Sequence, residues 1–61
     1  MIFQEFESRS GRKVYINPKA ITCLIEHDDE ETAIYFSGED DHLNVKHSLK
    51  EVVQILSKLE V

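Results

Sequence analysis

The sequence predicts a small α+β domain: an antiparallel, meander-like sheet of about five strands with one C-terminal helix packed on one face. Five short segments rich in β-branched and aromatic residues follow one another, separated by turn residues. One segment with helical apolar spacing follows them. The chain has 61 residues, 41% of them hydrophobic and 31% charged, so we treat residues 1–61 as a single domain.

The expected strands are bounded by residues that turn or interrupt the chain. Gly11 is free to adopt positive φ in the turn 8–12, and Pro18 interrupts the chain because proline cannot donate to a strand ladder. The charged run 28–31 and the turn at Gly38 separate the later segments. The expected strands are therefore Ile2–Glu7, Lys13–Asn17, Ala20–His27, Thr32–Ser37 and His42–Lys46.

Alternation of side chains along these strands predicts two faces of the sheet. The face expected to contact the helix carries Val14, Ile16, Ile21, Cys23, Ile25, Ile34, Phe36, Leu43 and Val45. The opposite face is expected to carry Tyr15, Leu24 and Tyr35, joined by Phe3 and Thr22.

A capping box marks the start of the helix. Ser48 and Glu51 have the spacing at which each side chain binds a backbone N–H left unpaired at a helix N-terminus. Apolar residues then recur at three- and four-residue spacing, and this stripe is stable only against the sheet. The stripe consists of Leu49, Val52, Val53, Leu56 and Leu59, broadened by Ile55.

One helix covers one face of a sheet, so the other face is left to solvent or to a partner. A row of aromatic and leucine side chains on adjacent strands is unusual on a solvent-facing sheet. Two interpretations stay open: the sheet coils until these residues cover one another, or they contact a second copy or a protein partner. We favour the second, because so small a domain without a disulfide has little core. The expected interaction surface is Phe3, Tyr15, Leu24 and Tyr35.

Charge is segregated along the chain. Residues 8–25 contain no acid, and residues 26–41 contain no Lys or Arg. The basic segment holds four candidate phosphate-binding residues, Arg9, Arg12, Lys13 and Lys19, and they suggest an alternative function as a small nucleic-acid-binding regulator. The formal net charge of -5 argues against it. The acidic segment is expected to form solvated loops, because it lacks the acid spacing of a calcium-binding loop.

Few groups in the sequence are suited to catalysis or metal binding. Cys23 lies in an apolar run, where a thiol stays protonated. His27, His42 and His47 are expected to form no zinc site, because Cys23 and His27 would lie about 13 Å apart along one strand. His47 is expected to be partly buried at a strand end. No nucleophile–base pattern or glycine-rich phosphate loop is present in the sequence. We therefore expect no enzymatic activity, no metal, no cofactor and no small-molecule substrate.

The sequence also indicates a location. No apolar run approaches the roughly 20 residues of a membrane helix, and the N-terminal residues lack the basic start of a signal peptide. The single cysteine, Cys23, can form no internal disulfide, which is typical of a reducing compartment. We expect a non-enzymatic cytoplasmic interaction or regulatory module that forms a homo-oligomer or docks a protein partner, with no membrane contact.

Several short motifs, taken in order, carry a family resemblance. They are Gly11–Ile21, Ile25-Glu26, Thr32–Phe36 with Gly38, Val45-Lys46 and Ser48–Val52. This order resembles the short FlbD family of bacterial flagellum-associated proteins over nearly the whole chain, which implies a bacterial module. A looser likeness links the strand pattern and Ser48-Leu49 to the first half of LytTR DNA-binding domains. The second half of that domain is absent, so DNA binding is not implied, and neither likeness implies a catalytic residue.

Overall fold

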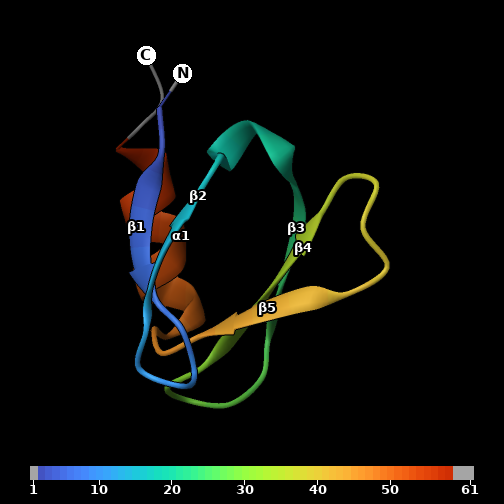
Figure 1. Cartoon of the computed structure of the whole chain (residues 1–61). Coiled ribbons are helices and arrows are strands. Elements are labelled where there is room, and N and C mark those ends of the chain that lie inside the picture. Colours follow the sequence, from blue (N-terminus) through green and yellow to red (C-terminus); the bar gives the residue numbers. More distant parts are fainter. Residues whose placement is uncertain (1, 59–61) are drawn as a thin grey trace.

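The computed structural model describes residues 2–58 and shows five antiparallel strands and one α-helix (Figure 1). The elements are β1 (Gln4–Glu7), β2 (Lys13–Ile16), the 3₁₀ helix η1 (Pro18–Ala20), β3 (Ile21–Glu26), β4 (Thr32–Phe36), β5 (His42–Val45) and α1 (Leu49–Ser57). The α+β class predicted from the sequence is confirmed. Each expected strand is present and is shorter than predicted.

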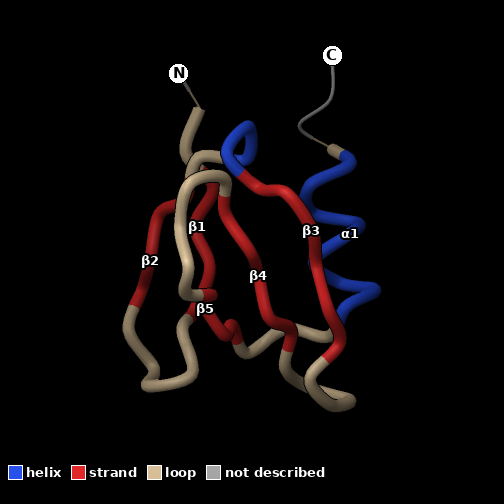
Figure 2. Tube along the Cα trace, turned by 90° about the vertical axis from the view of Figure 1, so that its right-hand side faces the viewer, coloured by secondary structure: helices blue, strands red, loops and turns tan. Residues whose placement is uncertain are grey.

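The strands form two hydrogen-bonded sheets rather than one continuous meander: β1 with β2, and β3-β4-β5. The strands β2 and β3 are not paired because η1, which begins at Pro18, turns the chain between them. The end of β1 reaches β5, where Ser8 pairs with Val45 and the Lys46 N–H donates to the Glu7 carbonyl at 2.8 Å. The spatial order is therefore β2-β1-β5-β4-β3, and Figure 2 shows α1 beside β3, on the opposite side from β2.

One small core lies between the two sheets and α1. Its buried cluster takes one side chain from each of β1, β2, β4, β5 and α1: Phe6, Ile16, Ile34, Val45 and Val52. Partly buried residues surround this cluster: Val14, Ile21, Leu24, Phe36, Leu43, Ile55 and Leu56. Because a single side chain represents each element, the loss of any one leaves a gap that few neighbours can fill.

The strand β3 does not alternate as the sequence predicts, because it contains a β-bulge. The register with β4 shifts between Ile21 and Cys23. The shift places Leu24 opposite the fully buried Ile34 and against the core, and it leaves Ile25 50% exposed and Cys23 exposed. The prediction that Leu24 lies on the helix-free face is therefore wrong, as is the prediction that Cys23 and Ile25 face the helix.

The helix α1 begins where the capping pattern predicts. Ser48 is the N-cap, and its Oγ accepts a hydrogen bond from the Glu51 N–H at 3.2 Å. Val52 is fully buried, whereas Val53 is 45% exposed, so its predicted place on the packed stripe is wrong. Leu59, the last predicted residue of the stripe, lies outside the described residues. Within residues 2–58, no helix is long and apolar enough to span a bilayer.

Candidate functional site

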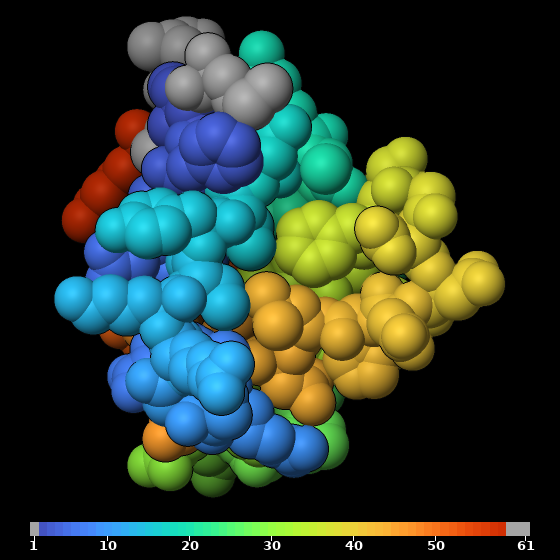
Figure 3. Space-filling view, in the orientation of Figure 1, coloured from blue at the N-terminus to red at the C-terminus, as the bar shows by residue number. Residues whose placement is uncertain are grey.

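The β1–β2 hairpin carries apolar and charged side chains on its outward side. The register pairs Glu5 with Tyr15 and Glu7 with Lys13, and all four residues are exposed. Phe3, two residues before Glu5, is 55% exposed, and Tyr15 is 63% exposed. We name these five residues the hairpin face: Phe3, Glu5, Glu7, Lys13 and Tyr15. Figures 1 and 3 share one view, in which the dark-blue N-terminal segment and the cyan β2 lie toward the viewer and α1 lies behind them.

A hydrogen bond links two members of the hairpin face. The Tyr15 hydroxyl donates to Glu5 Oε1 at 3.0 Å. This bond, helped by the negative charge of the carboxylate, raises the pKa of Tyr15 above its ordinary value. The hydroxyl therefore remains a neutral donor at physiological pH, while the ring stays exposed for contact.

Tyr35 lies apart from the hairpin face. On β4 it pairs with Cys23 of β3 and with His42 of β5, and its ring stacks on His42 with the ring centroids 5.0 Å apart. Because β1 and β5 lie between β2 and β4, Tyr15 and Tyr35 are not on adjacent strands. The row of exposed side chains expected from the sequence is therefore split, with Leu24 removed to the edge of the core.

The four candidate phosphate-binding residues are not gathered at one place. Arg9 donates through Nε and Nη2 to the two carboxylate oxygens of Glu31, at 2.9 and 3.1 Å. This pairing raises the pKa of Arg9 and lowers the pKa of Glu31. Arg12 and Lys13 are exposed at the start of β2, whereas Lys19 lies on η1 at the other end of that strand (Figure 1). The structure therefore commits Arg9 to an internal ion pair and divides the other three between the two ends of β2.

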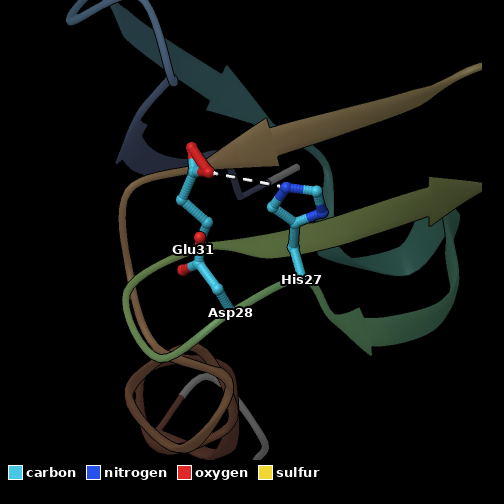
Figure 4. A group of neighbouring side chains, drawn as sticks. All are labelled: His27, Asp28 and Glu31. Carbon is cyan, nitrogen blue, oxygen red and sulfur yellow. Dashed lines mark ion pairs between the residues drawn. The ribbon is translucent and has the colours of Figure 1, made fainter.

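The β3–β4 loop brings together three side chains of metal-ligating type. Potential ligand atoms of His27, Asp28 and Glu31 lie within 4.8 Å of one another, and the dashed line in Figure 4 marks the 3.8 Å approach of Glu31 to His27. Arg9 already binds two of them, because its Nη2 contacts His27 Nε2 at 2.9 Å as well as Glu31. Asp28 accepts a hydrogen bond from the Glu30 N–H at 2.8 Å. The three groups are thus engaged by the protein's own donors.

An open acidic groove of about 650 Å³ lies between this loop and the start of α1. Its lining consists of six acids, one lysine and one serine: Glu7, Asp28, Asp29, Glu30, Glu31, Lys46, Ser48 and Glu51. These groups give a strongly negative potential. Among the described lining residues there is no activated nucleophile and no base oriented by a third group, so the groove suggests no catalytic mechanism.

His47 connects two elements of the fold. Its side chain is 20% exposed, which confirms the prediction that this histidine is partly buried. Its Nε2 accepts a hydrogen bond from the Glu7 N–H at 3.2 Å, and its Nδ1 lies 3.3 Å from Glu51 Oε1. The ring therefore links the end of β1 to the first turn of α1.

The ion pair that joins the β1–β2 turn to the β3–β4 loop was not predicted from the sequence. Arg9 and Glu31 are separated by 22 residues, and no local pattern signals their pairing. The register that sets Glu7 opposite Lys13 could have been predicted, because these two residues directly flank the five-residue turn 8–12. Counting outward from that turn would have placed these opposite charges across from each other.

No protein-family model matches the chain, and comparisons with curated proteins and with solved structures find no match either. The resemblance to the short FlbD family stays a prediction from the sequence.

Proposed function

We propose that the chain is a non-enzymatic cytoplasmic interaction module that self-associates or docks a protein partner through the hairpin face. The observation that carries the proposal is the exposure of Phe3 and Tyr15, at 55% and 63%, beside a strand that pairs on one edge only within residues 2–58. Exposed large apolar side chains next to an open sheet edge favour contact with another chain.

The small core supports the same proposal. The buried hydrophobic residues of the described chain are Phe6, Ile16, Ala33, Ile34, Val45 and Val52. A domain of about 60 residues buries only about 60% of the surface that its unfolded chain exposes, so its stability is marginal. Docking against another protein would bury the apolar side chains of the hairpin face, which the described residues of the monomer leave exposed to water.

The alternative of a nucleic-acid-binding regulator has less support from the geometry. Arg9 is paired with Glu31, and Lys19 lies at the far end of β2 from Arg12 and Lys13. A positively charged track along a nucleic-acid backbone needs its cations close together and free of internal partners. Binding that falls steeply with rising salt would favour this alternative.

Site-specific photocrosslinking in living cells tests the proposal. Tyr15 is replaced by a photoreactive phenylalanine analogue, and Val53, which is 45% exposed on α1, is replaced in a matched control. The hairpin probe should give discrete protein adducts, either of twice the chain mass or of a larger partner, and the helix probe should give none. Equal labelling from both positions, or no adduct from position 15, would contradict the proposal.

A further inference from the structure

The hairpin face carries opposite charges in two parallel rows. The row on β1 holds Glu5 and Glu7, and the row on β2 holds Lys13 and Tyr15. The register sets Glu7 level with Lys13 and Glu5 level with Tyr15. The face therefore has an acidic side on β1 and a basic and aromatic side on β2. The boundary between them runs along the strands.

This pattern is self-complementary under one symmetry operation. Consider a two-fold axis that lies in the interface, parallel to the strands and midway between β1 and β2. It keeps every residue at its level along the strands and places the β1 row of one copy over the β2 row of the other. It places Glu7 over the partner's Lys13 and Glu5 over the partner's Tyr15. A two-fold axis across the strands would instead lay β1 on the partner's β1, with carboxylates against carboxylates, which opposes association.

We infer that the occupant of the hairpin face is a second copy of this chain, docked face to face about the axis parallel to the strands; the inference rests on the proposed function. The dimer is held by burial of Phe3 and Tyr15 from both copies and by two symmetric Glu7–Lys13 pairs. The Tyr15 hydroxyl, already a donor to Glu5 at 3.0 Å, is at the level where it also meets the partner's Glu5.

The distribution of charge over the rest of the chain agrees with this arrangement. The formal net charge of -5 comes from the acidic segment 26–41, while residues 2–19 carry four bases and only two acids. Most of that acidic segment lies in the β3–β4 and β4–β5 loops, outside the hairpin. Two copies docked through their hairpins would therefore meet through the least negative segment of each sequence, with the acidic groove, which Glu7 also lines, at the edge of the contact.

A charge-swap experiment on the purified full chain tests the inference. In Lys13→Glu, Glu7 would face glutamate in the partner, and in Glu7→Lys, Lys13 would face lysine, so each variant should dimerise at least about tenfold more weakly than wild type in sedimentation velocity. An equimolar mixture of the two variants restores both pairs and should give a 1:1 heterodimer in native mass spectrometry. Thermal melts of each variant show whether it is folded, and the mixture controls for the altered pair within each hairpin.

Recovery of the heterodimer from two monomeric variants is the result we expect. Homodimers of both variants with wild-type affinity, or a mixture that stays monomeric, would overturn the docking geometry. A monomeric wild type at high micromolar concentration would overturn the choice of a second copy. In that case adducts from position 15 to a different protein would leave the proposed function standing, whereas the absence of such adducts would remove both.

Discussion

Replacement of Val52 by alanine is the sharpest test of how little core this domain has. Val52 is the one fully buried residue that α1 contributes to the core cluster, and its neighbour Val53 is 45% exposed. The two residues lie in the same helix and have the same type of side chain, so their alanine variants form a matched pair. The sequence pattern places both on the packed stripe, and the structure places only Val52 there.

The expected loss follows from the buried methyl groups. Truncation of Val52 removes two of them, worth about 1.6 kcal/mol in transfer from water. The cavity left behind outweighs the better helix propensity of alanine and brings the net loss to roughly 2–3 kcal/mol. At position 53 the transfer loss is about half as large and is offset by the better helix propensity of alanine, so the change should be within about 0.5 kcal/mol of zero. A domain of this length has a total free energy of unfolding of roughly 3–9 kcal/mol, so Val52→Ala removes a large part of it.

Thermal and urea unfolding followed by far-UV circular dichroism measures both variants. Val52→Ala should lower Tm by roughly 10–20 °C, and Val53→Ala should leave it nearly unchanged. Equal destabilisation by the two substitutions would mean that α1 is packed on a broader face than the structure shows. A negligible effect at position 52 would show that this helix contributes little to the core.

Three further changes have defined outcomes. Ser48→Ala removes the N-cap acceptor of α1 and should cost about 1 kcal/mol in urea unfolding, whereas Ser57→Ala, in the last turn, should stay within about 0.5 kcal/mol of wild type. Gly38 has φ of 80°, so Gly38→Ala should destabilise by about 1 kcal/mol although nothing lies near the added methyl group, and no loss would contradict that backbone conformation. Arg9 lowers the pKa of Glu31 in the folded state, so the stability from this carboxylate is full above its unfolded pKa and is lost as pH falls through the folded value. Glu31→Gln should therefore lower the urea midpoint at neutral pH, and its midpoint should fall less than that of the wild type when the pH is lowered. Urea midpoints that change in parallel with pH in the two proteins would refute the pairing.

The parts of the fold that local chemistry decides were predictable from the sequence. The start of α1 follows from Ser48 and the residue three positions later, because capping depends only on neighbours in the chain. The turn at Gly11, with φ of 89°, follows from glycine's freedom to adopt positive φ. The strands were found because β-branched and aromatic residues fit a pleated surface, although their ends were placed too far out.

Features that depend on tertiary contacts were not predictable in the same way. The bulge in β3 changes the sides on which Leu24 and Ile25 lie, and strict alternation contains no signal for an extra residue. The packed face of α1 is narrower than its apolar stripe, since Val53 lies about 100° around the helix from Val52 and turns away from so small a core. The Arg9–Glu31 pair depends on the approach of two distant loops, so no spacing rule could indicate it.

The division into two sheets explains why two tyrosines that look equivalent in the sequence have different surroundings. In a single flat meander both would stand on one helix-free face, but η1 separates β2 from β3 and moves Tyr15 and Tyr35 onto different sheets. Tyr35 gains cover from the stacked ring of His42, whereas Tyr15 gains one hydrogen bond and stays 63% exposed. Because the free energy of association grows with the apolar area removed from water, the gain from a partner is larger at Tyr15. The hairpin face, rather than the broader surface expected from alternation, is therefore where docking would stabilise this domain.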